Sequence, residues 1–309
     1  MLETIFSVEL GLAEELSVKR IRYTPLNKKS KKRISIVTGI HGDELEGQMV
    51  SFLLNNFLSK NKEAVRETID VYPVVNPLGV DVSSRNVPPE DIDLNRIFPG
   101  SKNGTLPERI AYALVEAVKG SDIVIDIHSS NIFLKEVPQA RINSEYARKL
   151  VPLALKMNLN FIWVHKPVDN LYSTFTCSMN KLGSRAVLIE MGIGQRISKD
   201  YSYQVFNGIL NLLVEEGFLD YKIPVPIKEP PLSVKGKIHF IYAEHPGVFV
   251  NNQKHGQMVK KGEIIGSVVS PHTGEELEIV VSPADGLLFT LREHPLVYPG
   301  SLLARVFEE

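Results

Sequence analysis

The feature that most constrains the fold of this chain is an alternation of short apolar segments with longer amphipathic ones over residues 33–216. The short segments are nearly continuous runs of Ile, Val and Leu, which predicts strands buried on both faces of a sheet. The longer segments repeat apolar residues at helical spacing, as residues 47–58 do. The pattern predicts an α/β fold in which a mostly parallel, mixed sheet carries helices on both faces.

The order of the expected elements follows from these segments. We expect an opening strand or hairpin over residues 5–24, further strands over 34–38, 69–75, 123–127, 161–164 and 186–191, and helices over 47–58, 106–119, 144–157 and 199–216. Thr105 and Glu108 have the spacing of a capping box at the start of one helix. Pro152 is expected to weaken or kink another.

The composition and the pattern of apolar residues change near residue 221. Residues 221–231 contain four prolines and read as a semi-rigid linker, and the remainder consists of short apolar runs separated by glycines. We therefore predict two domains, a larger one over residues 1–225 and a small all-β barrel-sandwich domain over residues 226–309.

Composition excludes several classes of function. A formal net charge of −1 argues against a protein that binds nucleic acid through bulk charge, and we read the lysine cluster at residues 28–33 as a solvated turn. No segment reaches the roughly 18 apolar residues of a membrane span, so no membrane role is expected. The single cysteine, Cys177, allows no intrachain disulfide, which favours a reducing compartment such as the cytoplasm.

Polar residues follow several of the expected strands where each strand ends. His41, Asn76, His128 and Glu190 occupy such positions, and ligands of parallel sheets bind outside the carboxyl ends of the strands. We therefore expect these four side chains to converge.

Two histidines and a glutamate in this group have the chemistry of a metal site. His41 and Glu44 are three residues apart, which places them on one side of a helical turn, and His128 arrives from another strand end. Two nitrogens and a carboxylate form the ligand set of a catalytic zinc with an open fourth position, which indicates metal-assisted hydrolysis. Asp126 either orients a histidine ligand or caps nearby backbone, and both interpretations stay open.

Four further residues complete the predicted site. Glu190 closes an apolar strand, where a carboxylate is costly unless it faces a polar cavity, so we interpret it as a general base. Asn95 and Arg96 suit a planar substrate carboxylate, and Arg85 suits an oxyanion. The competing interpretation is that Arg85 and Arg96 pair with the acidic residues of their own loop.

Four motifs, His-Gly-Asp-Glu at 41–44, Asp-Leu-Asn-Arg-Ile-Phe-Pro-Gly at 93–100, Asp-Ile-His at 126–128 and Ile-Glu-Met-Gly at 189–192, occur in this order. In this the chain resembles the succinylglutamate desuccinylase/aspartoacylase family of the zinc carboxypeptidase superfamily. The resemblance implies a zinc carboxypeptidase-like fold and one Zn²⁺ per subunit on His41, Glu44 and His128. It implies Glu190 as the acid/base and Arg85 near the scissile carbonyl, with Asn95 and Arg96 on the substrate carboxylate.

The C-terminal region is similar to the biotinyl/lipoyl-like module of that family. Residues 270–280 contain no lysine that a carrier domain would modify, so we expect a lid or gating module, with Tyr242 and Tyr298 as candidate substrate contacts. One departure concerns the arginine that aspartoacylases place before the catalytic glutamate. Asn180, Lys181 and Arg185 occupy that stretch here, and none aligns with it.

The expected activity is hydrolysis of an N-acyl amino acid or a similar small amide by a zinc-dependent deacylase. The same carboxylate clamp would serve a metallocarboxypeptidase that trims peptide C-termini, and this alternative stays open. A non-catalytic binding protein that retains the pocket is the rival from another class. The expected partner is a small molecule, and a homo-oligomer is compatible with the sequence.

Overall fold

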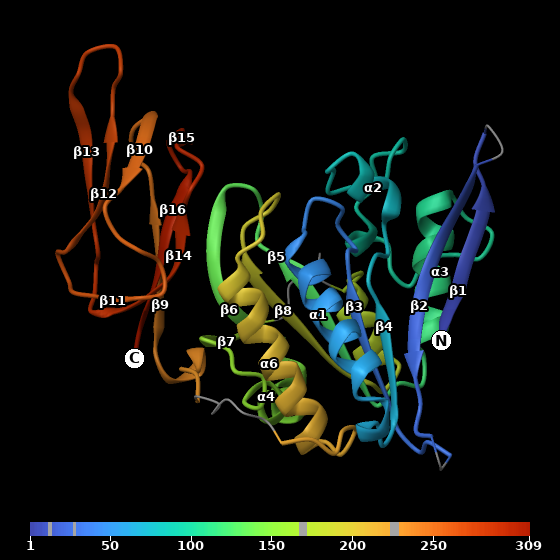
Figure 1. Cartoon of the computed structure of the whole chain (residues 1–309). Coiled ribbons are helices and arrows are strands. Elements are labelled where there is room, and N and C mark those ends of the chain that lie inside the picture. Colours follow the sequence, from blue (N-terminus) through green and yellow to red (C-terminus); the bar gives the residue numbers. More distant parts are fainter. Residues whose placement is uncertain (12–13, 27–28, 167–171, 223–228) are drawn as a thin grey trace.

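A long twisted sheet organises the whole chain (Figure 1). The computed structural model describes residues 1–11, 14–26, 29–166, 172–222 and 229–309. The twelve strands of the long sheet are β1 (Leu2–Glu9), β2 (Glu15–Tyr23), β3 (Arg33–Thr38), β4 (Thr68–Tyr72), β5 (Ile123–Ser129), β6 (Leu134–Asn143), β7 (Phe161–His165), β8 (Arg185–Gly192), β9 (Lys237–Tyr242), β11 (Met258–Val259), β14 (Gly286–Arg292) and β16 (Leu302–Glu308).

The sheet is mixed, with a parallel centre and one further parallel pair formed by β6 and β7. Strands β4, β3, β5 and β8 are neighbours in that order and run parallel. The β1–β2 hairpin joins one side antiparallel, and β6 joins β8 antiparallel on the other. The predicted mixed sheet is confirmed. Among the described residues up to 222, for which a mostly parallel sheet was predicted, four of the seven strand pairs are parallel, whereas the C-terminal strands extend the sheet with antiparallel pairs.

Helices cover both faces of the central strands, as the sequence predicts. They are α1 (Glu46–Lys60), α2 (Pro77–Asp81), α3 (Leu106–Val118), α4 (Ala147–Ala154), α5 (Phe175–Lys181) and α6 (Lys199–Glu215), with short 3₁₀ turns at Lys62–Ala64, Leu94–Arg96, Ser144–Tyr146 and Ser233–Lys235. Buried residues of α1, α4 and α6 form one apolar core, and those of α3 and α5 form another. Among the described residues, none of the helices is both long and apolar enough to cross a membrane.

Three local predictions have clear outcomes. Thr105 and Glu108 form the predicted capping box at the start of α3, where the Glu108 carboxylate accepts from the Thr105 backbone N–H at 2.8 Å. The helix predicted over residues 144–157 is shorter, because a 3₁₀ turn precedes α4 and Pro152 lies inside its last turn. The hairpin predicted within residues 5–24 is β1–β2.

The sequence did not predict β6, which interrupts its apolar residues with Lys135, Glu136, Pro138 and Arg141. A register shift lies between Glu136 and Gln139, so β6 carries one more residue than β8 does across the same span. This is a β-bulge, and it accommodates Pro138, which has no N–H to offer a sheet.

The C-terminal unit continues the same sheet. Strand β14 pairs with β6, β16 pairs with β14, and β9 follows β16 (Figure 1). A second sheet of β13 (Glu276–Val281), β12 (Ile264–Val269), β10 (Gly247–Asn251) and β15 (Leu296–Val297) packs against them around a shared apolar core. This is a two-sheet arrangement. The predicted boundary between residues 225 and 226 lies outside the described residues.

Candidate active site

The first two candidate ligands lie in the tight turn that joins β3 to α1. Gly42 in this turn packs directly on α2, because a Cβ added there would lie 2.0 Å from the carbonyl carbon of Gly79. Asn76 holds α2 in place, since its side-chain oxygen accepts from the Gly79 N–H at 2.9 Å. The glycine of the His-Gly-Asp-Glu motif is therefore required by close packing, and it fixes the path of the turn that carries His41 and Glu44.

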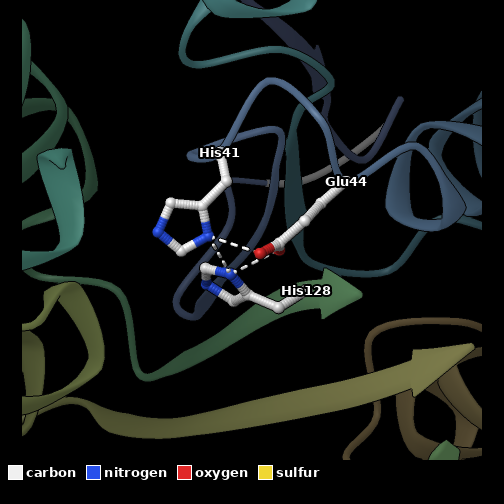
Figure 2. Close-up of side chains that lie close together, drawn as sticks. All are labelled: His41, Glu44 and His128. Carbon is white, nitrogen blue, oxygen red and sulfur yellow. Dashed lines mark hydrogen bonds and ion pairs between the residues drawn. The ribbon is translucent and has the colours of Figure 1, made fainter. Parts of the chain in front are cut away.

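His41, Glu44 and His128 face one another at the carboxyl ends of β3 and β5 (Figure 2). The Nδ1 atom of His41 lies 2.7 Å from Glu44 Oε1, and the Nδ1 atom of His128 lies 2.9 Å from Glu44 Oε2. The two Nδ1 atoms are 3.1 Å apart. All three side chains are buried, which is costly for polar groups that have no partner.

The far side of each imidazole ring lies beside an aspartate. His41 Nε2 is 3.1 Å from Asp93 Oδ1, and His128 Nε2 is 3.0 Å from the fully buried Asp126 Oδ2. Of the two interpretations of Asp126, the contact favours the one in which it orients a histidine. Carboxylates at these positions fix the ring and direct Nδ1 toward the centre of the site.

The electrostatics of the three residues are those of a coupled cluster. Burial alone would raise the pKa of Glu44, but His41 and His128 hold it well below its ordinary value. Burial opposes charge on both rings, yet Glu44 and Asp93 raise the pKa of His41, and Asp126 and Glu44 raise that of His128. A carboxylate that stays ionised is what a divalent cation requires of a ligand.

This donor set fits zinc. Nitrogen and oxygen ligands about 2.1 Å from a tetrahedral zinc ion lie about 3.4 Å apart, close to the separations found among the three side chains. Each histidine also has the carboxylate partner that histidine ligands of zinc commonly have. Within the described residues these three form the one group with suitable atoms close enough together.

All seven predicted site residues line one cavity of about 370 Å³. Its lining consists of His41, Glu44, Arg85, Asn95, Arg96, His128, Arg141, Asn143, Tyr146, Leu150, Trp163, His165, Thr174, Thr176, Cys177, Asn180, Ala186, Leu188 and Glu190. His41, His128 and Glu190, which follow or close strands, therefore meet as expected. Asn76 does not join them, because its side chain caps α2 and donates to the backbone of Asn86.

The predicted clamp residues have different surroundings. The Asn95 side-chain oxygen accepts from the Phe175 N–H at 2.9 Å, and the exposed Arg96 donates to the Asn95 backbone carbonyl. Arg85 Nη1 donates to Glu44 Oε1 at 3.0 Å, and Arg85 also pairs with Asp93. Loop pairing, the competing interpretation, thus describes part of Arg85's contacts, and Arg96 lines the cavity.

Glu190 extends from β8 next to His128 in the sheet register, and its side chain is 16% exposed. Burial raises its pKa to about 7, and the neighbouring Arg141 opposes this. Arg141 Nε lies 2.8 Å from Glu190 Oε2, which leaves Oε1 without this cation. A carboxyl group with a pKa near neutrality can both accept and return a proton.

Residues 30–215, more than half of the chain, match the family described as "Succinylglutamate desuccinylase/Aspartoacylase catalytic domain". The chain belongs to this family. The resemblance drawn from the four motifs is thereby confirmed. A curated relative, N-alpha-acetyl-L-2,4-diaminobutyric acid deacetylase of Halomonas elongata, is 27% identical over 278 residues, which are 87% of this chain and 80% of the relative.

Solved structures of the family share the fold along the whole chain. A succinylglutamate desuccinylase/aspartoacylase from Rhodobacter sphaeroides superposes with a TM-score of 0.82 at 19% identity, covering 100% of this chain and 96% of its own. The product-bound Ectoine utilization protein EutE (DoeB) from Ruegeria pomeroyi also gives 0.82, at 20% identity and with 100% and 95% covered. At such identities the likeness establishes the fold.

Other candidates from the sequence have partners within the protein or lie away from the cavity. The Asn180 side chain bonds to the backbone of Thr176 and Ala186, and Arg185 pairs with Glu216. Tyr242 and Tyr298 are exposed, and no described side chain of the C-terminal unit lines the cavity, contrary to the expectation of a lid. Arg141, which the sequence did not single out, is the arginine beside Glu190. Its signal was a charge within a buried strand.

Proposed function

We propose that this chain is a zinc-dependent amidohydrolase that removes the acyl group from an N-acyl amino acid or a similar small amide bearing a carboxylate. The observation that carries the proposal is one cavity that combines the His41–Glu44–His128 group with Glu190 and Arg96. A volume of about 370 Å³ lies at the lower end of the range for small-ligand sites, which favours a small molecule over a peptide.

Recognition of the substrate falls to the 3₁₀ turn at Leu94–Arg96. The Arg96 guanidinium offers a planar fork to the free carboxylate, and the Asn95 amide NH₂ adds a donor while its oxygen stays bonded to Phe175. Fixing the carboxylate orients the amide carbonyl toward Arg85, whose guanidinium balances charge that develops on the carbonyl oxygen.

Proton transfer falls to Glu190. A divalent ion bound by His41, Glu44 and His128 supplies Lewis-acid polarisation and acidifies water. Glu190 Oε1 accepts a proton from the attacking water and returns it to the leaving amine nitrogen, so that the amide C–N bond breaks to give a carboxylic acid and a free amine. Arg141 remains on Oε2 throughout.

The curated relative directs the choice of first substrates. The Halomonas elongata protein is named for the deacetylation of an N-acetylated amino acid, so N-acetyl amino acids are the first class to test. The buried free thiol of Cys177 agrees with a reducing compartment such as the cytoplasm.

The test is release of primary amine from a panel of N-acetyl and N-succinyl amino acids with acidic, neutral and basic side chains, set beside peptides with free C-termini. We expect chelator-sensitive release from one or a few N-acyl amino acids. Release from peptides alone would replace the proposal with the metallocarboxypeptidase alternative. Binding of these compounds with no turnover of any of them would favour the non-catalytic binding protein.

A further inference from the structure

A buried carboxylate with two arginines lies next to the catalytic cavity. Glu136 is 1% exposed, and its oxygens accept from Arg141 Nη2 at 2.9 and 2.7 Å, from Arg305 Nη1, and from Gln139 Nε2 at 2.9 Å. Thr290 adds a contact at 3.3 Å. A buried charge is retained only when it is paired in this way, so Glu136 depends on both arginines.

The bulge in β6 makes this arrangement possible. Side chains alternate along a strand, so Glu136 and Arg141, five residues apart, would lie on opposite faces of a regular β6. The one extra residue between Glu136 and Gln139 reverses the alternation. As a result Glu136, Gln139 and Arg141 lie on one face, and Arg141 reaches Glu190 on the neighbouring strand β8.

The second arginine comes from the C-terminal unit. Arg305 of β16 is opposite Thr290 of β14, and Thr290 is opposite Glu136 of β6, so the three residues form one row across three strands. Through this row a residue far along the chain contacts the carboxylate that holds Arg141. The C-terminal unit therefore touches the active site through Glu136 and Arg141, although its described side chains lie outside the cavity.

The network is balanced in charge, and its two arginines share one aromatic ring. Two arginines face Glu136 and Glu190, so the four groups sum to zero when both carboxylates are ionised. The guanidinium carbons of Arg141 and Arg305 each lie 5.2 Å from the ring centre of Trp163, the only tryptophan of the chain. Cation–π contacts of this kind fix both side chains further.

We propose that Arg305 and Glu136 are positioning residues for hydrolysis: they hold Arg141 on Glu190 Oε2, so that the C-terminal unit fixes the carboxylate that moves the proton. The inference rests on the proposed role of Glu190. A carboxylate whose supporting groups are lost samples more orientations, and the cost falls on the chemical step more than on substrate binding.

The kinetic test compares Arg305→Met with Arg292→Met in the full-length protein. Arg292 belongs to the same C-terminal unit and donates to the backbone carbonyls of Leu296, Leu302 and His294, without a contact to Glu136. We expect R305M to lower kcat about tenfold, with KM and bound zinc within twofold of wild type. R292M should lower the melting temperature and leave kcat within twofold. R305K keeps a positive charge beside Glu136, and this variant should recover at least half of the lost rate.

A second readout needs no activity and separates this proposal from the proposed function. Melting temperatures of wild type, E190Q, R305M and the double variant form a cycle, as do those with R292M. Because Arg305 and Glu190 share no direct contact, we expect the shift caused by E190Q to differ by about 2 °C or more between wild type and R305M, and to be unchanged by R292M. Additive shifts, or an R305M kcat within twofold of wild type, would overturn the proposal. Absence of hydrolysis by wild type would instead count against the proposed function, and the cycle would still decide the network.

Discussion

At the scale of single residues, Glu190 has two oxygens in different surroundings. Oε2 lies beside Arg141, whereas Oε1 is the proposed site of proton transfer. Glu190→Gln keeps the shape and removes the base. We expect kcat to fall by about 10²- to 10⁴-fold while zinc bound per chain stays unchanged, measured by amine release and metal analysis. A Gln variant with near-normal kcat would exclude the role.

Arg96 permits a test of carboxylate recognition. Arg96→Met removes the guanidinium, and because hydrogen bonds to charged groups are the stronger ones, KM for the best N-acyl amino acid should rise about tenfold or more. The matched control is the same substrate with its carboxylate replaced by a carboxamide. Wild type should bind the carboxamide more weakly than the carboxylate substrate. R96M should bind the two compounds equally weakly. If replacing the carboxylate with the carboxamide weakened binding by R96M as much as binding by wild type, Arg96 would not bind the carboxylate.

That the seven site side chains would gather in one cavity could be predicted from sequence, because their signals are local. Histidines and acids stand directly after apolar runs, and strand ends of a parallel sheet meet at one edge. Arg141 and Glu136 could not be found this way. Their strand has a proline and a bulge, which conceal its period, and their partner Arg305 is more than 160 positions away from each.

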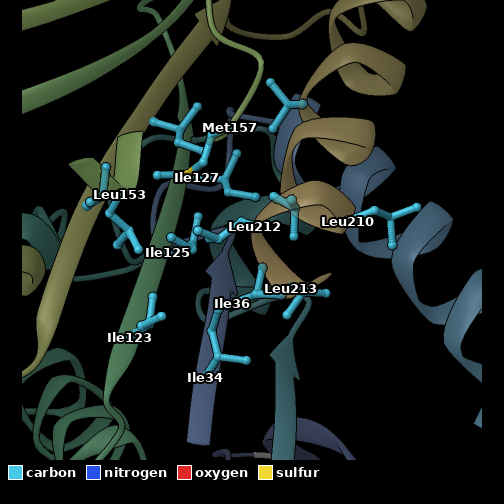
Figure 3. Packing of buried hydrophobic residues seen from close by; sticks show 14 of the residues in the cluster. Ile34, Ile36, Ile123, Ile125, Ile127, Leu153, Met157, Leu210, Leu212 and Leu213 are labelled. Atoms are coloured by element: carbon cyan, nitrogen blue, oxygen red, sulfur yellow. The ribbon is translucent and has the colours of Figure 1, made fainter. Parts of the chain in front are cut away.

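At the scale of elements, the apolar strands and helices were predictable because each carries its own period. Figure 3 shows the result, with Ile34 and Ile36 of β3 and Ile123 and Ile125 of β5 in one apolar cluster with Leu213 of α6. The strands are buried on both faces, so they read as continuous apolar runs. The boundaries shifted by a few residues, as at α1, because caps and loop contacts decide them.

The ion pairs of Glu216, the residue that follows α6, predict a pH dependence. At the end of α6 its carboxylate accepts from Lys156 at 2.6 Å and pairs with Arg185 of β8 at 2.8 Å. Burial opposes ionisation, yet these cations lower its pKa below the ordinary 4.5. The stabilisation is therefore complete above about pH 4.5 and is lost as the pH falls further.

The variant Glu216→Gln should accordingly be less stable than wild type by about 1 kcal/mol at pH 7, and the difference should shrink as the pH falls from 4.5 to 3. Urea unfolding at each pH measures it. Glu215→Gln, on the exposed side of the same turn, is the control and should stay close to wild type. A gap between E216Q and wild type that is constant from pH 7 to 3 would contradict the assignment.

At the scale of the whole molecule, the sequence predicted two domains, and the structure joins their strands in one sheet. Pairing of β14 with β6, and the contact of Arg305 with Glu136, connect the C-terminal unit to the catalytic strands. This attachment was not predictable, because the spacing of apolar residues within a strand does not show which distant strand becomes its neighbour. It gives the two parts a shared core at Phe161, Phe289 and Phe307.

Because the two parts share one sheet and one core, we expect them to unfold cooperatively. We expect calorimetry of the full chain to show a single transition whose calorimetric and van't Hoff enthalpies agree. Phe289→Ala, which removes a buried ring from the shared core, should move that transition to lower temperature without splitting it. Two separate transitions in wild type would show that the parts fold independently.

The most direct measurement is the rate of amine release as a function of zinc added to metal-free protein, with the best N-acyl amino acid of the panel. One site on His41, Glu44 and His128 predicts that the rate rises in proportion to bound zinc and levels off at about one equivalent per chain. His128→Ala should bind less than half an equivalent under the same conditions and stay inactive. Full activity in the metal-free protein, or in H128A, would contradict zinc-dependent hydrolysis at this site.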